Sequence, residues 1–515
     1  MYKPALEDIK QIVKSGQYDL IPLSTEMYSD MVTPIDVFKK LKKISKHCFI
    51  LESANSVCED AKTWGRYTFL GFNPSLEITC NNGIMTLTSQ LPGKENKLFK
   101  TDNPNKYLQE ILNQNKSVKL DYLPSFTGGL VGYFAYDYVK YSEPLLNLDK
   151  SPDTAEEDQF NDVDLMLFDK VIAFDHYRQK IILIVNIKTD NLKTEYENGI
   201  KQLEELKKII NNGEHEQMPI ANLKSDFKAL FTEDGYCQMV NRAKDYINNG
   251  EISQIVLSNR YEADFEGSIF DTFRVLRTIN PSPYMFYFSG ANQEIAGASP
   301  ETLVKLFNGK LSTFPLGGTR RRGATSEEDT ALEKELLADK KELSEHDMLV
   351  DIGKEDLGKV SKPGTVKVEK YKTVLKFSHV MHIGSTVIGE IREDKTGLDV
   401  INAILPAGTL SGAPKKRAMQ IINEQEVFTS TDGEVSKVQC KRGIYGGAIG
   451  YLDFTGNMDT CIAIRMVYRK NNKVFVRSGA GIVAESKPES EYQECVNKST
   501  AVMNALRLSN GGLDK

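Results

Sequence analysis

The sequence lacks the cysteine patterns of a disulfide-stapled or zinc-binding protein. Its 515 residues include 7 cysteines, an odd number, and no Cys-x-x-Cys pair occurs. A disulfide framework or a zinc site is therefore not expected, and free thiols fit a reducing cytoplasm.

Long hydrophobic runs and an excess of basic residues are also missing. The longer apolar runs, such as Ile181–Val185, have only the length of a strand, and the opening segment MYKPALEDIK lacks the apolar stretch of a signal peptide. Lys and Arg total 65 against 71 Asp and Glu, which gives a net charge of −6. Neither a membrane span nor nucleic-acid binding is expected from this pattern.

The N-terminal part combines strands and helices without a repeat. The local patterns predict a helix over Leu6–Ser15, an exposed loop over Ser151–Asp164, strands over Val171–Phe174 and Lys180–Ile187, and a helix over Thr194–Asn211. The polar segment 212–224 contains Pro219 and is the best linker candidate. We therefore expect an N-terminal region over residues 1–215 that packs against a larger catalytic region over residues 225–510.

The C-terminal half is more regular. Helices are predicted over Tyr236–Asn249, Thr272–Thr278, Ser326–Leu349 and Pro488–Leu506, with Ser326 and Asp329 as a capping box for the third. Strands are predicted over Ser253–Asp264, Met285–Ser289, Leu303–Phe307, Ala448–Phe454, Thr460–Tyr468 and Lys473–Ser478. Strands and helices without a βαβ rhythm indicate an α+β fold with antiparallel sheets.

Two glutamate pairs stand at helical spacing. Glu342 and Glu345 share one helix face, and Glu491 and Glu494 repeat the spacing with Lys498 one turn further on. Magnesium takes oxygen ligands and needs only one or two carboxylates when an anionic substrate supplies the rest. Two solvated helix faces would show the same spacing, so the pattern alone leaves both interpretations open.

Glycines and arginines form further candidate sites. Gly479, Ala480 and Gly481 follow a strand, and glycine lets backbone N–H groups approach an anion, although the pattern alone favours tight turns. Arg465 lies in the strand-like run CIAIRMVY, where either a structural ion pair or a substrate carboxylate would serve as its partner. His379 and His382 are three apart on a predicted strand, so at most one faces a site.

Long segments of the chain resemble the chorismate-utilising enzymes, and within them the component I subunits of anthranilate synthases. The segments are QIVLSNR, NPSPYMFY, GASPETLV, ELLADKKELSEHDMLVDIGKEDLGKV, SHVMHI, PAGTLSGAPKKRAM, RGIYGGAIGY, DTCIAIR, SGAGIVAES and ESEYQEC, in this order between Tyr236 and Leu506. The resemblance implies an α+β fold in which antiparallel sheets form a sandwich-like core with outer helices.

The resemblance assigns roles to residues. It implies Mg²⁺ as cofactor, with Glu345 and Glu494 as direct ligands and Glu342 and Glu491 holding metal-bound waters. Chorismate would be bound by Tyr445, Arg465, Gly479, Ala480, Gly481, Lys498, Gly318 and Thr319. Thr409 would lie in the site, Glu301 would protonate the departing 4-hydroxyl, and His382 would remove the C2 proton as pyruvate leaves.

The choice of reaction within the family depends on two positions. Relatives that add water to chorismate use a lysine base where this chain has Gln254, and ammonia needs no such base. Aminodeoxychorismate synthases carry a lysine where this chain has Gly317. The resemblance therefore favours a lyase that converts chorismate and ammonia to anthranilate and pyruvate, the first committed step of tryptophan biosynthesis. Aminodeoxychorismate synthase of folate biosynthesis is the alternative, and a non-catalytic sensing subunit is the alternative of another class.

The resemblance also implies regulation and a partner. The residues that match a tryptophan site are Leu51, Glu52, Ser53, Asn280, Pro281, Met285, Phe286 and Cys461. A core strand followed by a helix cap would show the same pattern in Leu51–Ser53. Since the sequence contains no glutaminase domain, ammonia from glutamine would come from a separate glutamine amidotransferase subunit, component II, in a heterotetramer.

Overall fold

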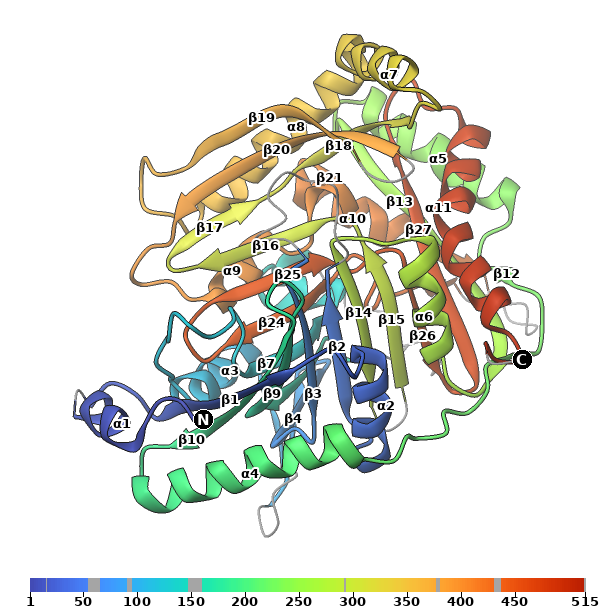
Figure 1. The fold of residues 1–515 in the computed structure, drawn as a ribbon. Coiled ribbons are helices and arrows are strands. Elements are labelled where there is room, and N and C mark those ends of the chain that lie inside the picture. The colour runs from blue at the N-terminus through green and yellow to red at the C-terminus, as the bar shows by residue number, and fades with distance from the viewer. Residues whose placement is uncertain are drawn as a thin grey trace.

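Two large antiparallel β-sheets form the centre of the molecule, and helices cover their outer faces (Figure 1). The computed structural model describes residues 1–14, 16–53, 65–89, 95–146, 160–290, 293–376, 380–429 and 437–513. The α+β architecture predicted from the sequence is confirmed. Among the described residues, no helix combines the length and hydropathy needed to cross a bilayer.

The first sheet has 13 strands in the order β1-β10-β9-β3-β2-β14-β15-β26-β27-β13-β11, with β12 and β21 also paired to β13. Its strands are β1 (Leu20–Tyr28), β2 (Cys48–Glu52), β3 (Tyr67–Phe72), β9 (Lys170–Asp175), β10 (Lys180–Lys188), β11 (Asn222–Leu223), β12 (Lys228–Ala229), β13 (Gln254–Glu266), β14 (Tyr284–Ser289), β15 (Gln293–Ser299), β21 (Gly412–Ala413), β26 (Met466–Lys470) and β27 (Lys473–Ile482).

The second sheet has 12 strands in the order β18-β20-β17-β16-β25-β24-β7-β8-β4-β5-β6, with β19 paired to β20. Its strands are β4 (Leu76–Asn81), β5 (Ile84–Ser89), β6 (Lys97–Lys100), β7 (Gly129–Phe134), β8 (Val163–Phe168), β16 (Thr302–Phe307), β17 (Lys310–Thr313), β18 (Leu316–Arg321), β19 (Lys367–Lys376), β20 (Val380–Glu390), β24 (Ala448–Asp453) and β25 (Met458–Ile462). Separately, β22 (Val427–Thr429) pairs with β23 (Lys437–Gln439).

Both sheets take strands from both halves of the chain. In the first sheet β2 pairs with β14, where Glu52 stands opposite Met285. In the second sheet β7 pairs with β24, where Phe134 stands opposite Ala448. The N-terminal strands therefore extend the same two sheets that carry the C-terminal motifs, while the division at residues 215 and 225 stays a prediction.

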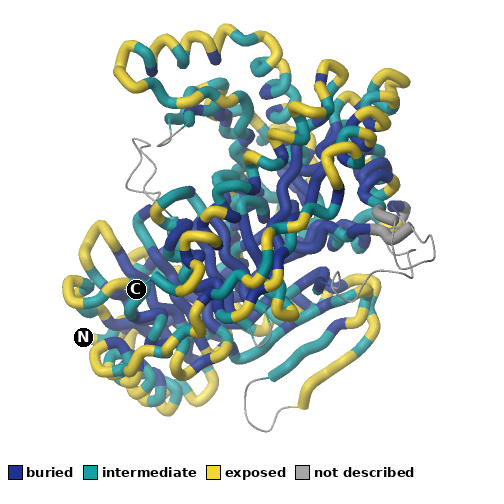
Figure 2. Tube along the Cα trace, turned by 90° about the vertical axis from the view of Figure 1, so that its right-hand side faces the viewer, coloured by how far each residue is buried: buried dark blue, intermediate teal, exposed yellow. Residues whose placement is uncertain are grey.

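Alternation along the strands divides the core into three layers. In β7, Leu130 and Phe134 pack beneath the helices of the second sheet, whereas Val131 and Tyr133 face the layer between the sheets. That inner layer joins residues of both sheets, such as Phe286. Figure 2 shows the buried strands at the centre and the exposed residues on outer helices and loops.

Helices cover the outer faces. Those that share the core of the first sheet are α1 (Leu6–Val13), α2 (Pro34–Ile44), α4 (Leu192–Asn212), α5 (Glu233–Asn248), α6 (Phe270–Ile279), α10 (Lys415–Gln425) and α11 (Pro488–Ser509). Those on the second sheet are α3 (Pro104–Asn113), α7 (Ser326–Ala338), α8 (Lys340–Gly358), α9 (Gly397–Ile404) and the 3₁₀ segment η1 (Tyr136–Tyr141). Two further 3₁₀ segments lie between elements: η2 (Pro144–Leu146) contacts η1 and α10, and η4 (Gly408–Leu410) contacts α8 and strands β13, β21 and β27.

Most predicted elements are present, and three predictions are wrong in part. The prediction of an exposed loop over residues 151–164 is wrong at its C-terminal end, because Phe160 and Asp162 are buried and β8 begins at Val163. Residues 151–159 lie outside the described residues. Val163, the first residue of β8, stands opposite Cys80 of β4 and Phe134 of β7. These partners are distant in sequence, so no local pattern reveals the pairing.

The predicted helix Ser326–Leu349 is two helices. It breaks at Asp339, whose extended backbone (ψ 103°) and side chain, which accepts from the N–H groups of Lys341 and Glu342, begin α8 anew. The N-cap of α7 is Thr325 and not Ser326, so the predicted capping box is absent. Asp329 is instead held by Arg322.

The predicted strand Thr460–Tyr468 is also two elements. β25 ends at Ile462 in the second sheet, and β26 begins at Met466 in the first. Arg465 stands in the crossover with a left-handed backbone (φ 52°), a conformation that non-glycine residues adopt rarely and mainly at constrained sites. Arg465 is therefore not inside a strand.

Candidate active site

The start of α8 positions the first glutamate pair. Asp339 fixes where the helix begins, and Arg320 of β18 donates to Asp339 Oδ2 over 2.8 Å. Arg320 also lies 3.5 Å from Glu342 Oε1, which ties the first turn of α8 to β18. Glu342 and Glu345 follow on the half-buried side of this helix.

Helix α11 carries the second pair opposite α8. Glu491 lies in its first turn, where the helix dipole favours a carboxylate, and Glu494 follows in the second turn. Lys498, one turn further on, lies 2.6 Å from Glu494 Oε1 and donates to the carbonyl of Gly479 over 3.2 Å. The ammonium group of Lys498 thus links α11 to the glycines of β27.

The charges of the two glutamate pairs act on one another. Burial, followed by the charges of Glu342, Glu494 and Glu491, raises the pKa of Glu345, although Lys341 acts in the opposite direction. Burial and then the charge of Glu494 raise the pKa of Glu491. Carboxylates that repel one another in this way favour a cation between them.

The donor set fits magnesium rather than a metal held by protein alone. Within the described ranges, no three His, Cys, Asp or Glu side chains form a group that could hold a metal ion. Magnesium keeps several waters and binds through one or two carboxylates plus oxygens of the substrate. Glu345 and Glu494, from facing helices, match that requirement, and Glu342 and Glu491 stand beside them.

Glycines 479 and 481 lie on the inner face of β27, opposite Ser258 and Val256 of β13. A Cβ at residue 479 would lie 2.5 Å from the carbonyl of Leu257 and 2.9 Å from the hydroxyl of Tyr445. A Cβ at Gly481 would lie 2.9 Å from the amide nitrogen of Gln254. Only glycine therefore allows Tyr445 and Gln254 to approach this strand.

The crossover directs Arg465 toward α11. Its Nη1 donates to the carbonyl of Lys498 over 2.6 Å. Burial lowers the pKa of Arg465, while the neighbouring Tyr445 and Glu494 act to raise it. A half-buried guanidinium beside Tyr445 and Glu494 is suited to bind a carboxylate through its other N–H groups.

Glu301 is a half-buried carboxyl group between β15 and β16. Its backbone carbonyl accepts from the N–H of Ile462, and Thr409 of η4 donates to its Oε1 over 3.1 Å. Burial raises the pKa of Glu301 to about 7, against the lowering effects of Thr409 and Lys498. A carboxyl group whose pKa lies near neutral pH can be protonated in the resting site and donate that proton during a reaction.

His382 of β20 faces the same region. Its Nδ1 donates to the carbonyl of Gly318 over 3.0 Å, and the hydroxyl of Thr319 lies 3.1 Å from the same nitrogen. This hydrogen bond places the lone pair of the neutral ring on Nε2. Burial lowers the pKa of His382, and the charge of Arg465 adds to the lowering. His379 lies outside the described residues.

The structure therefore brings most predicted site residues to one place, where β13, β18, β20 and β27 meet α8, α11 and η4. They are Gln254, Glu301, Gly318, Thr319, Glu342, Glu345, His382, Thr409, Tyr445, Arg465, Gly479, Ala480, Gly481, Glu491, Glu494 and Lys498. Ala480 points away from this face, into the core beneath α5 and α10, and offers only its backbone.

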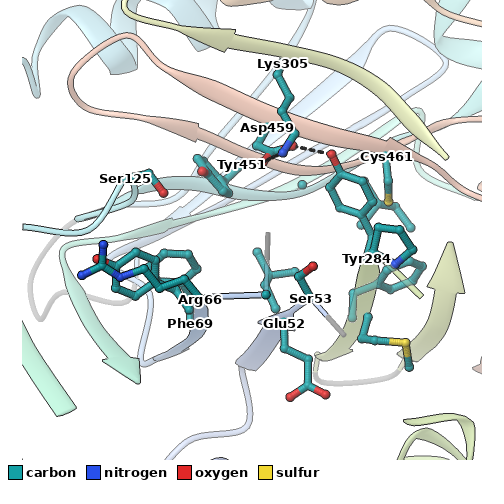
Figure 3. Close-up of a pocket in the computed structure, with 18 residues that line it drawn as sticks. Glu52, Ser53, Arg66, Phe69, Ser125, Tyr284, Lys305, Tyr451, Asp459 and Cys461 are labelled. Atoms are coloured by element: carbon teal, nitrogen blue, oxygen red, sulfur yellow. Dashed lines mark hydrogen bonds and ion pairs between the residues drawn. The ribbon is translucent and has the colours of Figure 1, made fainter. Parts of the chain in front are cut away.

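A separate cavity opens between the two sheets (Figure 3). Six of the residues predicted to bind tryptophan line it: Leu51, Glu52, Ser53, Met285, Phe286 and Cys461. Asn280 and Pro281 do not line it. Asn280 ends α6, Pro281 is exposed, and Pro283 and Tyr284 occupy the wall instead.

The cavity also has polar residues that the sequence did not predict. The hydroxyl of Tyr284 donates to Asp459 over 2.8 Å, and Lys305 lies 2.9 Å from the same carboxylate, as Figure 3 shows beside Cys461. Among the described residues, Ser53 has a buried hydroxyl without a hydrogen-bond partner. The carboxylate of Glu52 points away from Tyr284 and Asp459 in Figure 3, and Arg277 donates to it. Tyr284 lies within the segment NPSPYMFY, so the sequence did contain a signal for this residue.

Comparison with known proteins supports one family. The model of the chorismate binding enzymes matches residues 46–504. Component 1 of the anthranilate synthase of Acetivibrio thermocellus is 41% identical over 514 residues, which covers 98% of this chain and 99% of that protein. The corresponding protein of Aquifex aeolicus is 41% identical over 509 residues, with 98% of each chain covered.

Solved structures agree. Anthranilate synthase component I of Streptococcus pneumoniae is 34% identical with a TM-score of 0.70, covering 92% of this chain and 98% of that one. The menaquinone-specific isochorismate synthase MenF of Escherichia coli, at 18% identity and a TM-score of 0.66 over 98% of this chain and 99% of its own, is alike in fold alone. The chain therefore belongs to the chorismate binding enzyme family.

Proposed function

We propose that this protein is the chorismate-converting component 1 of an anthranilate synthase, a lyase that turns chorismate and ammonia into anthranilate and pyruvate. The observation that carries the proposal is Glu301, a half-buried carboxyl group whose pKa desolvation raises to about 7, hydrogen-bonded by Thr409. Full-length relatives named as component 1 of anthranilate synthase support the choice.

Substrate binding would use the two carboxylates of chorismate. Arg465 and Tyr445 would hold the enolpyruvyl carboxylate, since both lie on one side of the glycine strand. The ring carboxylate would lie against the backbone of Gly479–Gly481 and Lys498. Gly318 and Thr319 would close the opposite side through their bulged strand, where Gly318 has φ +62°.

Glu345 and Glu494 would hold magnesium directly, and Glu342 and Glu491 would orient its waters. When bound, magnesium supplies a positive charge that neutralises the ring carboxylate and orients it. The remaining work falls to the side chains of the protein.

Proton transfer would be divided between Glu301 and His382. Protonated Glu301 would donate to the departing 4-hydroxyl while ammonia bonds to C2. His382 would then take the C2 proton on Nε2, because Nδ1 is committed to the carbonyl of Gly318. As that proton leaves, the C3–O bond would break and the ring would become aromatic, and the released enol would take up a proton on carbon to become pyruvate.

Amination is favoured over hydration by Gln254. Its amide nitrogen lies against Gly481, at the position where hydrating relatives are expected to have a lysine base, and an amide cannot take a proton from water. A side chain at Gly317, where aminodeoxychorismate synthases carry lysine, would start against His346 of α8, at 3.3 Å. Aminodeoxychorismate synthesis remains the second candidate, since the same groups would bind chorismate.

A partner subunit would supply the ammonia. The relatives are named component 1, which implies a component II, and we propose a glutamine amidotransferase in a heterotetramer. The described cysteines, Cys48, Cys80, Cys237, Cys440, Cys461 and Cys495, are free thiols, which supports a cytoplasmic setting.

The proposal is tested by nitrogen source and product together. Purified chain with chorismate, Mg²⁺ and ammonium is expected to produce anthranilate fluorescence, whereas glutamine in place of ammonium gives none until a glutaminase partner is added. Equal rates with glutamine in the purified chain would refute the partner claim, and chorismate consumption without anthranilate would refute the activity.

We also propose that the cavity between the sheets binds tryptophan as a feedback inhibitor. Its walls are apolar and aromatic, and its polar groups, Ser53 and the Tyr284–Asp459–Lys305 cluster, suit an amino-acid backbone. Cys461 on β25 lines the cavity, and the next residue, Ile462, donates to the carbonyl of Glu301 over 3.0 Å. Tryptophan bound in the cavity would therefore act on the position of Glu301 through β25.

Filling the cavity tests this regulation. Ser53→Phe is expected to weaken tryptophan binding by about 5- to 150-fold, because overpacking costs about 1–3 kcal/mol. Calorimetry measures the Kd, and anthranilate formation without tryptophan should stay unchanged. The matched control is Ser326→Phe at an exposed position on α7, which should bind tryptophan normally. Undiminished affinity in Ser53→Phe would place the tryptophan site elsewhere.

A further inference from the structure

A fully buried cluster of charges lies directly behind the site, on the inner face of the first sheet. Glu426, Arg442 and Arg477 are at most 4% exposed, and Ser258 between them is 0% exposed. The cluster holds one acidic and two basic side chains, so it carries a net positive charge without contact with water. None of the site roles proposed above uses it.

Glu426 is the centre of the cluster. Arg442 donates to both of its oxygens through Nε (3.0 Å) and Nη2 (2.5 Å), and Arg477 Nη2 donates to Oε2 over 2.8 Å. Ser258 donates to Oε1 through its N–H and its hydroxyl, each over 2.9 Å. Burial acts to raise the pKa of Glu426, and the two arginines outweigh it, so the carboxylate is charged.

Arg442 connects the cluster to the turn that carries Thr409. Its Nη1 donates to the carbonyl of Leu410 over 2.6 Å, and its Nη2 to the carbonyl of Val256 over 2.7 Å. Val256 in turn donates its N–H to Ser411 over 2.9 Å. The residue next to Leu410 is Thr409, which donates to Glu301.

The same guanidinium supports Tyr445. Arg442 lies over the rings of Tyr136, at 4.8 Å, and Tyr445, at 5.9 Å. Arg477, from β27, donates to the carbonyl of Lys441 over 2.7 Å and to Ser258 over 2.8 Å. Since Ser258 pairs with Gly479 and Val256 with Gly481, the cluster also fixes the strand that bears the glycines.

Stability alone does not explain such a cluster. Desolvating three charges costs about as much as their attraction returns, so buried ion pairs are weak contributors to folding, whereas their geometry is strongly directional. Arg442 donates to the carbonyl of Leu410, the residue next to Thr409, and lies over the ring of Tyr445. Orienting these two side chains is therefore the physical role that remains for the cluster.

We propose that Glu426, Arg442 and Arg477 are positioning residues that hold Thr409, Tyr445 and the Gly479–Gly481 strand in one fixed arrangement around the substrate. The proposal rests on the function proposed above, because it requires Glu301 to act as the acid that Thr409 orients. It predicts that loosening the cluster changes the behaviour of Glu301 without touching Glu301 itself.

The test compares two buried glutamates. Glu426→Gln removes the charge at the centre of the cluster and keeps the volume. Glu294→Gln does the same at a buried glutamate of β15 that accepts from Ser268, Ile269 and Tyr287, outside the site. Arg442→Lys is the second cluster variant, because it keeps the positive charge and loses the fork to Leu410, Val256 and Glu426. Melting temperatures ensure that each assay is run on folded protein.

Glu426→Gln and Arg442→Lys are each expected to lower kcat/KM for chorismate with ammonium by about 100-fold, the effect of displacing reacting groups by about 1 Å. The alkaline limb of the pH profile should also move to higher pH, as in Thr409→Val, because the hydrogen bond that lowers the pKa of Glu301 is weakened. Glu294→Gln should leave the limb in place.

Two outcomes would overturn the proposal. One is a cluster variant whose kcat/KM stays close to that of Glu294→Gln. The other is a fall in kcat/KM with the alkaline limb unmoved, which would reveal a merely structural contribution. Failure of the wild-type chain to form anthranilate would instead sink the proposed function, so the two failures are distinguishable.

Discussion

Glu301→Gln is expected to lower kcat by about 10²–10⁴-fold, the usual contribution of a general acid. The amide keeps the size of the side chain and can still accept the hydrogen bond from Thr409, but it has no proton to give to the departing 4-hydroxyl. Chorismate affinity should change little, since binding is assigned to Arg465, Tyr445 and the glycine strand. Steady-state anthranilate formation with saturating ammonium measures the effect.

The pH dependence of kcat/KM tests the same role of Glu301. Burial raises the pKa of Glu301 to about 7, and the acid acts in its protonated form, so kcat/KM of the wild type falls as pH rises through about 7. Burial lowers the pKa of His382, and the base acts in its neutral form, so activity is lost on the acidic side only below the ordinary histidine range. Glu301→Gln should abolish the alkaline limb. Activity within tenfold of the wild type, with the limb intact, would assign the acid to another group.

Removing both predicted metal ligands is expected to have an effect of similar size. Glu345→Ala with Glu494→Ala should lower kcat/KM by about 10³-fold, because a bound divalent ion contributes several kcal/mol and each 1.36 kcal/mol is tenfold. Calorimetric titration of Mg²⁺ should lose its binding heat in the same variant. Glu342→Gln and Glu491→Gln, which stand behind the waters, should each cost about 10–100-fold.

The matched control uses glutamates on the same two helices that point into solvent. Glu355 of α8 is 77% exposed, and Glu489 of α11 is exposed as well. Glu355→Ala with Glu489→Ala should leave kcat/KM within about threefold of the wild-type value. If the Glu345 and Glu494 variant matched this control, the magnesium assignment would fail.

The local patterns of the sequence were sufficient for most helices and strands, whereas residues such as Glu301 and Thr409 were assigned to the site only by the family resemblance. Glu342 and Glu345 do share a helix face, yet the helix that carries them begins at Asp339, an N-cap hidden among helix-forming neighbours. Intrinsic propensity favours helix on both sides of Asp339, and the contact with Arg320 of β18, distant in sequence, decides the break.

Arg465 shows even more clearly that local patterns do not reveal contacts with distant segments. The continuous apolar run on both sides of Arg465 predicted one strand, and the chain instead leaves one sheet and joins the other at this residue. A change of sheet depends on partners such as β16 and β15, which lie more than a hundred residues earlier, and leaves no periodic signal. The crossover is nevertheless what brings the guanidinium to α11.

The pairing of β2 with β14 and of β7 with β24 was equally invisible, because strand partners far apart in sequence carry no local mark. These pairings create the cavity between the sheets, so its polar wall of Tyr284, Lys305 and Asp459 could not be predicted from Leu51–Ser53 alone. The buried cluster of Glu426, Arg442 and Arg477 was missed for the same reason, since its members come from three separate segments.

The central claim is that this chain aminates chorismate and completes the elimination of pyruvate. The most direct measurement is mass spectrometry of the product formed by the purified chain from chorismate, Mg²⁺ and ¹⁵N-labelled ammonium. Labelled anthranilate with an equal amount of pyruvate is the expected result. Labelled aminodeoxychorismate that retains its enolpyruvyl group, or unlabelled isochorismate, would contradict it.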